Sequence, residues 1–196
     1  MPQGPVRAPE RSLGELAELA NRFNNLYRDE EVPSRGQDSN WLISIRNICV
    51  FDELRPTEGS CRVLFLCAPS SCYVLSSRIL PPYSGQGSQE IDELVYQLLS
   101  LFTLHDCSLP IRNFKTAYAP WTWSIADADL GKRLCQRLGE IGIDEPDLLV
   151  METATADEIE KANAAWKLWH STTTRDWVNN NKPMTYRQCY DVSYAP

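Results

Sequence analysis

The sequence predicts an α/β fold, of the α+β kind, in which a three-stranded antiparallel meander is followed by the order α-β-α-β-α. Two observations predict it. Strand-like apolar runs at 41–52, 61–68 and 71–82 are separated by short polar links, and from residue 88 onward helical patterns alternate with short apolar segments. We therefore expect one mixed sheet flanked by helices. A chain of 196 residues is long enough to bury the core of one such domain.

The first helix is expected at 12–27, where apolar residues recur at helical spacing. Ser12 and Glu15 stand three apart, as in a capping box. Residues 1–11 contain three prolines and no apolar period, which indicates a flexible arm. The run at 41–52 is rich in β-branched and aromatic residues, "RPTEGS" reads as a turn, and the nearly continuous apolar run "CRVLFLCA" suits a central strand.

The second half begins with a helix from Ser88, followed by a short strand near "FKTAYA" at 114–119. A second helix is expected with Ser124 as its N-cap and Asp127 in an acidic variant of the capping box. Its apolar face ends before Gly142, which occupies the position of a C′ glycine with Ile143 after it. Its expected apolar face comprises Leu130, Leu134, Leu138 and Ile141.

The last strand and helix are expected at "DLLVME", 147–152, and from the capping box of Thr155 and Glu158 through Trp169. Residues 171–196 are polar but contain several aromatic residues, so we expect a tail that packs against the domain. The organisation is therefore an arm at 1–11, one domain at 12–170 and a packed tail.

Charge and cysteine content bound the function. A net charge of −7 and a pI near 4.9, without a dense basic run, disfavour nucleic acid and anionic membranes as partners. No apolar run approaches the length of a bilayer span, and no signal-like segment opens the chain, so we expect the cytoplasm or the nucleus. The seven cysteines stand mostly in apolar runs without metal-ligand spacing, which indicates free thiols and no zinc site.

One catalytic alternative is a metal-dependent nuclease, because the order of elements is that of the ribonuclease-H-like fold. Such a hydrolase would hold Mg²⁺ or Mn²⁺ between converging carboxylates. Asp52 at the end of the first strand, Glu93 on the helix that follows, and Asp157 or Glu158 are the candidates, although the strand ending at "AYAPWTW" offers no acid. The competing interpretation is that these acids are turn and helix-capping residues.

Two other candidate sites have less support in the sequence. His105 and Cys107 stand two apart in "LHDCSLP", which is poor geometry for a thiol nucleophile and its base. The loop "SGQGSQE" at 84–90 places two glycines before a helix N-terminus, where backbone N–H groups could hold a phosphate, but an ordinary flexible loop is the favoured interpretation.

Tryptophan supplies the best candidate for a binding surface. The chain has six, and tryptophan is enriched at interaction hot spots. We expect partner contacts at Trp121, Trp123, Trp169 and Trp177. The alternative is that Trp166 lies on the core face of the last helix and Trp177 holds the tail.

The segment "PWTWSIADADLGKRLCQRLGEIGIDEPDLLVMETATADEIEKANAAW" resembles a recurrent pattern in uncharacterised proteins of mushroom-forming fungi, some of which carry MYND-type zinc fingers, and a bacterial domain of unknown function. The resemblance covers mainly residues 61–169, and the Cys/His array of a MYND finger is missing here. It implies a compact α/β module without an assigned activity, catalytic residue or zinc ion.

The sequence therefore predicts a non-catalytic protein–protein interaction or regulatory module inside the cell. It needs no cofactor and binds another protein, and self-association is left open. The alternative is the ribonuclease-H-like hydrolase with its divalent cation.

Overall fold

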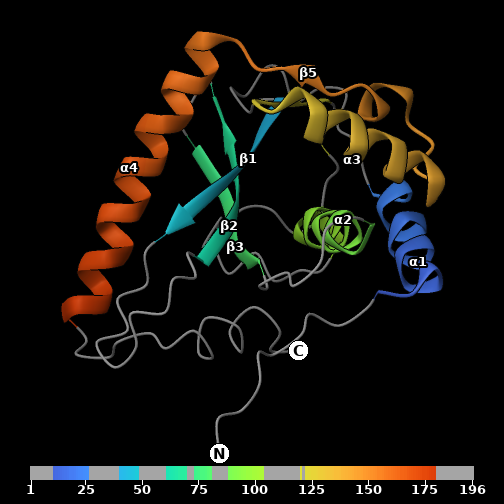
Figure 1. Ribbon diagram of the computed structural model, residues 1–196, viewed down its shortest axis with the longest axis horizontal. Coiled ribbons are helices and arrows are strands. Elements are labelled where there is room, and N and C mark those ends of the chain that lie inside the picture. The colour runs from blue at the N-terminus through green and yellow to red at the C-terminus, as the bar shows by residue number, and fades with distance from the viewer. Residues whose placement is uncertain are drawn as a thin grey trace, which may run out of the picture.

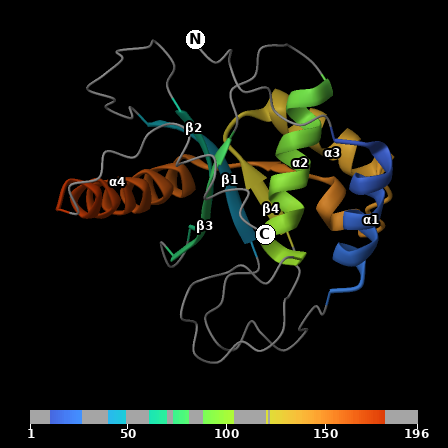
Figure 2. The same ribbon diagram turned by 90° about the horizontal axis from the view of Figure 1, so that it is seen from below.

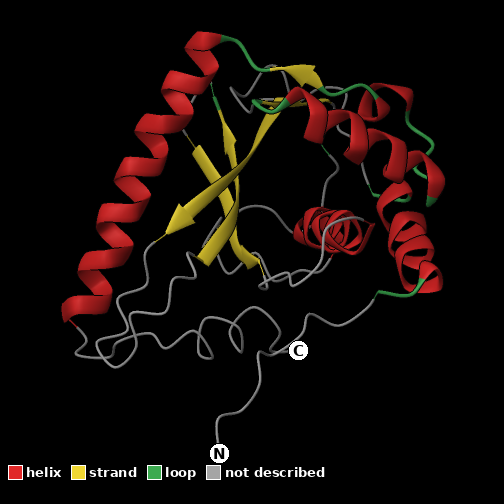
Figure 3. Ribbon diagram, in the orientation of Figure 1, coloured by secondary structure: helices red, strands yellow, loops and turns green. Residues whose placement is uncertain are grey.

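The described residues form one mixed five-stranded sheet with helices on both of its faces (Figures 1 and 3). The computed structural model describes residues 11–26, 40–48, 61–69, 73–80, 88–103, 120 and 122–179. Its elements are, in order, α1 (Leu13–Asn24), β1 (Asn40–Ile48), β2 (Cys61–Ala68), β3 (Tyr73–Leu80), α2 (Ser88–Thr103), β4 (Thr122–Ile125), α3 (Ala128–Glu140), the short 3₁₀ helix η2 (Pro146–Leu149), β5 (Glu152–Thr153) and α4 (Ala156–Asn179).

The strand order across the sheet is β3-β2-β1-β4-β5. Both β1–β2 and β2–β3 are antiparallel, so the predicted meander is confirmed. On its other edge β1 pairs in parallel with β4, which pairs in parallel with β5. A strand can pair in parallel with its neighbour only after a crossover connection. The chain passes through α2 on its way from β3 to β4, and through α3 on its way from β4 to β5. The α/β class and the mixed sheet are thus as the sequence predicts.

The two faces of the sheet carry separate apolar clusters, because neighbouring residues of a strand point to opposite faces. Along β2, Leu64 and Leu66 join the larger cluster with α1, α2 and α3, whereas Phe65 and Cys67 join the smaller cluster with α4. Figures 1 and 2 show the same division, with α4 on one side of the strands and the other three helices opposite. Of the described helices, α4 alone covers the second face.

The caps of α1 and the end of α3 follow the predicted chemistry. Ser12 is the N-cap of α1, its hydroxyl accepts from the Glu15 backbone N–H, and the Glu15 carboxylate accepts from the Ser12 N–H. These bonds from Ser12 hold the pKa of Glu15 below its ordinary value. At the end of α3, Gly142 has φ +96°, and the Ile143 N–H donates to the Leu138 carbonyl at 3.0 Å, which completes a Schellman motif.

The start of α3 differs from the prediction. Ser124 is buried within β4, and the N-cap is Asp127, whose carboxylate accepts from the N–H groups of Asp129 and Leu130. The short run "TWSI" is buried almost throughout, as expected of an inner strand pairing on both edges, so it lacks an alternating pattern. The strand expected at 114–119 lies outside the described residues.

The first half of the segment expected as a strand at 147–152 belongs to a 3₁₀ helix. Pro146 occupies its first turn and Leu148 is buried, whereas Val150 is exposed, so β5 is reduced to Glu152–Thr153. After the predicted Thr155 capping box, α4 continues to Asn179, beyond the domain boundary expected at residue 170.

Two further observations concern the cysteines and the possibility of a membrane span. Cys67, which is buried, and Cys135, which is half-buried, are not joined to another cysteine by a disulfide bond. Among the helices of the described residues, none has the length and apolar character needed to cross a bilayer.

Candidate functional site

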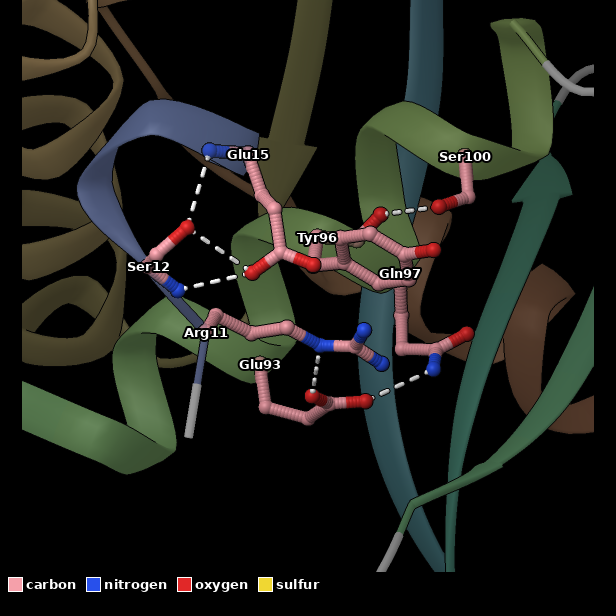
Figure 4. Close-up of polar contacts among 7 residues, drawn as sticks. All are labelled: Arg11, Ser12, Glu15, Glu93, Tyr96, Gln97 and Ser100. Carbon is pink, nitrogen blue, oxygen red and sulfur yellow. Dashed lines mark hydrogen bonds and ion pairs between the residues drawn. The ribbon is translucent and has the colours of Figure 1, made fainter. Parts of the chain in front are cut away.

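Glu93, the carboxylate expected on the helix after the meander, lies in a buried charged cluster between α1 and α2 (Figure 4). Its Oε2 accepts from Arg11 Nε at 2.9 Å and its Oε1 accepts from Gln97 Nε2 at 2.7 Å. The Arg11 guanidinium also lies 3.6 Å from the centre of the Tyr96 ring, a close cation–π contact. Both carboxylate oxygens are therefore bound to side chains of the same chain, and the contact joins the start of α1 to α2.

The acids at the start of α4 lie on the opposite face of the sheet from Glu93. Asp157 pairs with Lys161 at 2.7 Å. Glu158 caps the helix through Thr155, and its Oε1 also accepts from Asn40 Nδ2 of β1 at 3.1 Å. The sheet lies between α4, which carries these acids, and α2, which carries Glu93 (Figure 1).

A shared cation site therefore does not arise from Glu93, Asp157 and Glu158. Within the described ranges, we find no group of three His, Cys, Asp or Glu side chains that could hold a metal ion. Asp52, the first carboxylate of the hydrolase alternative, lies outside them.

A cluster of aromatic side chains lies where the C-terminal half of α4 crosses the sheet. Trp166 and Trp169 are stacked, with ring centres 5.0 Å apart, and Phe65 of β2 meets both edge-on. The His170 ring lies 5.7 Å from that of Trp166. We call Phe65, Trp166, Trp169 and His170 the α4 aromatic cluster.

The α4 aromatic cluster reaches the surface. Phe65 is fully buried, but Trp166, Trp169 and His170 are each only half-buried. Leu168, which stands between Trp166 and Trp169 in the sequence, is 71% exposed. Trp169 is the one predicted partner-contact residue whose side chain the structure places at this surface.

Arg46 of β1 lies beside the same cluster. Its Nε donates to Ser44 Oγ at 3.1 Å and its Nη1 donates to Asn163 Oδ1 of α4 at 2.7 Å. Burial lowers the pKa of the Arg46 guanidinium, and the Cys67 thiol acts in the opposite direction. Both hydrogen-bond partners are neutral, and none of the ion pairs among the described residues includes Arg46.

Of the other predicted tryptophan contacts, the structure places Trp123 away from this surface. Trp123 is a core residue with 0% exposure: its ring stacks on Phe23 and its Nε1 donates to the Leu148 carbonyl at 2.7 Å. A side chain so enclosed cannot touch a partner without unfolding, so we remove it from the contact set. Trp121 and the side chain of Trp177 lie outside the described residues.

The remaining candidates concern thiols and the glycine loop. His105, Cys107 and the loop glycines lie outside the described residues. Cys135 is half-buried and accepts from the Met151 backbone N–H at 3.3 Å; burial raises the pKa of its thiol, with that hydrogen bond opposing. This environment disfavours the thiolate that a nucleophile needs.

Sequence reasoning missed Arg46, whereas the alternative that places Trp166 on the core face of the last helix agrees with its packing beside Ile159 and Ala162. An arginine in a strand was a usable signal, because it interrupts the apolar residues of a buried run. Its partner Asn163 is 117 residues away, however, and no local pattern indicates such a contact.

No protein-family model, no curated protein and no solved structure matches this chain. The resemblance to proteins of mushroom-forming fungi therefore stays a prediction.

Proposed function

We propose that the chain is a non-catalytic binding module and that it contacts another protein through the α4 aromatic cluster. The observation that carries the proposal is the stacked, half-buried pair of Trp166 and Trp169. Tryptophan at a partly exposed position supplies large contact area at a low entropic cost, and it is enriched at interaction hot spots.

The local packing supports this assignment because the pair is held in place before any partner arrives. Phe65 fixes both rings from the sheet side, and the buried Ala162 and Ala165 let α4 approach β2 closely. An apolar surface that is rigid in the free protein loses less entropy on binding than a mobile one. The cluster therefore has the features of a preformed contact surface.

The hydrolase alternative draws less support from the described residues. Glu93 is bound by Arg11 and Gln97, and the sheet lies between its helix α2 and α4, which carries Asp157 and Glu158. The order of elements is the one that suggested the hydrolase alternative from the sequence. An order of elements is an argument about the fold alone, and one fold serves many activities.

The proposal is tested by Trp169→Ala in the full chain. Removing this ring should weaken partner binding by about 30-fold, which corresponds to about 2 kcal/mol, the threshold for a hot spot. The measurement is quantitative capture of proteins from an extract of cells that express the chain, on immobilised wild type and variant. Light scattering of both proteins tests whether the partner is a second copy of the chain.

Val150→Ala is the matched control, because Val150 is an exposed apolar residue on the loop before β5. It should retain every protein that the wild type retains. If Trp169→Ala, with an unchanged far-ultraviolet spectrum, retains the same proteins and the same mass in solution, the α4 aromatic cluster is not the binding surface.

A further inference from the structure

Arg46 is a partly buried cation that the described residues leave without a counter-ion. A guanidinium carries five N–H donors, and here Nε and Nη1 donate to Ser44 and Asn163, both neutral. Nη2 makes no hydrogen bond to the described residues, and the Arg46 side chain as a whole is half-buried. Burying a charge is costly unless an opposite charge accompanies it, so this position favours an external anion.

Arg46 and the α4 aromatic cluster are linked through shared neighbours on the same face of the sheet. Ser44, which accepts from Arg46, stands opposite Phe65 in the β1–β2 register, and the Phe65 ring meets Trp166 at 5.2 Å. From the helix side, Asn163 holds Arg46 and lies one turn before Trp166. A ligand that covers the tryptophan pair therefore passes within reach of the guanidinium.

The charge of this part of α4 contrasts with the rest of the chain. The protein carries a net charge of −7, yet residues 162–171 of α4 include no Asp or Glu. Lys167 follows Asn163 by four residues, so it lies on the same side of the helix, and it is exposed. Lys167 thus adds a positive charge one turn after Asn163, the residue that holds Arg46, while Glu160 lies one turn before Asn163.

We propose that the surface formed by Arg46, Asn163, Trp166, Lys167 and Trp169 binds an acidic peptide segment of the partner. A carboxylate of an Asp or Glu side chain meets the free edge of the Arg46 guanidinium, and an adjoining apolar side chain covers the tryptophan pair. This inference rests on the proposed binding function and specifies the chemistry of its partner.

An acidic peptide suits the surface better than a nucleic acid does. Non-specific binding of a nucleic acid depends on neutralising several phosphates, and this surface offers Arg46 and Lys167 in a chain whose net charge repels the rest of the strand. A single carboxylate is also the planar anion that a guanidinium fork pairs with best. One anion beside one apolar residue therefore accounts for the arrangement.

The test selects peptides from a random phage-displayed dodecapeptide library on the full wild-type chain. We expect the selected sequences to be enriched in Asp and Glu next to an apolar or aromatic residue. A synthetic selected peptide should lose about 30-fold in affinity for Arg46→Met, the lower end of the effect of removing one partner of a buried charge pair. Replacing its acidic residue by the corresponding amide should weaken binding to the wild type similarly and change binding to Arg46→Met little.

Arg133→Met is the matched control, because it removes one positive charge from an exposed position of α3 on the other face of the sheet. It should bind the peptide as the wild type does. Lys167→Glu changes an exposed position where folding is not at risk, and it should weaken binding of the peptide by about tenfold. This variant tests the inference if Arg46→Met does not fold.

The outcomes separate the two proposals. In one outcome the selected peptides are not enriched in acidic residues, and they lose binding with Trp169→Ala but not with Arg46→Met or Lys167→Glu. This outcome would overturn the acidic partner and leave the proposed binding surface intact. Peptides insensitive to Trp169→Ala and to both charge changes would overturn both proposals. A fluorescent 20-nucleotide single-stranded RNA that binds more tightly than any selected peptide, and loses binding with Arg46→Met, would overturn the peptide in favour of a nucleic acid.

Discussion

The buried pair of Arg11 and Glu93 provides the most demanding test of the packing between α1 and α2. The side chains are 10% and 1% exposed, so neither charge is well solvated. Replacing Arg11 by Met keeps an apolar stem but removes the ion pair and the contact with Tyr96, leaving a carboxylate in the interior. Breaking a buried pair from one side costs about 3–5 kcal/mol, a large share of the ~5–15 kcal/mol that stabilises a typical domain.

Glu93→Gln keeps the shape of the site but leaves one acceptor oxygen for two donors and the Arg11 charge without its carboxylate, so we expect it also to cost about 3–5 kcal/mol. In the double variant neither charge remains, and the loss should fall short of the sum of the single losses by about 2 kcal/mol or more. Urea unfolding followed by tryptophan fluorescence measures all four proteins. Additivity within about 0.5 kcal/mol would refute the coupling.

An exposed pair on α1 serves as the control for the same chemistry. Arg22 and Glu18 are also an ion pair, but their side chains are 57% and 64% exposed. Arg22→Met should therefore change the free energy of unfolding by no more than about 0.5 kcal/mol.

Three local changes test other parts of the fold by the free energy of unfolding. Gly142→Ala should cost about 1 kcal/mol, because φ is +96° while an added Cβ would meet no atom within 4 Å; no loss would contradict the left-handed cap. Asp127→Ala should cost about 1 kcal/mol and Asp129→Ala less than about 0.5 kcal/mol, and equal losses would reject Asp127 as the N-cap. The raised pKa of Cys135 means that the folded state holds its proton more tightly, so stability should be full below the ordinary value of 9.0 and fall as the pH rises above it. Comparison of wild type with Cys135→Ser at about pH 8 and about pH 10 checks this, and an identical fall in both would contradict it.

Local sequence signals were sufficient where the interaction is local. The pairs Ser12 with Glu15 and Thr155 with Glu158 are each three residues apart, so a capping box could be recognised without the fold. The same holds for Gly142, whose position after an apolar helical face required a left-handed residue.

Interactions between distant residues were beyond the sequence. The strand β4 is four residues long, and its Ser124 fits a helix cap equally well until β1 is seen beside it. Trp123 is of a residue type that is common at binding surfaces. It is a core residue here because its ring stacks on Phe23, which stands 100 positions earlier in the chain. The surface around Arg46 depends likewise on Asn163, which only the tertiary structure brings near.

The position of β1 in the middle of the sheet also bears on how the chain is made. Its partner β2 follows closely, but the partner on its other edge, β4, begins 82 residues later. At synthesis rates of about 5–20 residues per second, that edge waits roughly 4–16 s for its native neighbour. An unpaired strand edge can join another chain, so crowded ribosomes would favour misassembly during this interval. Slower translation before residue 122, or a chaperone that shields β1, should therefore govern the yield of native protein more strongly than the stability of the finished fold.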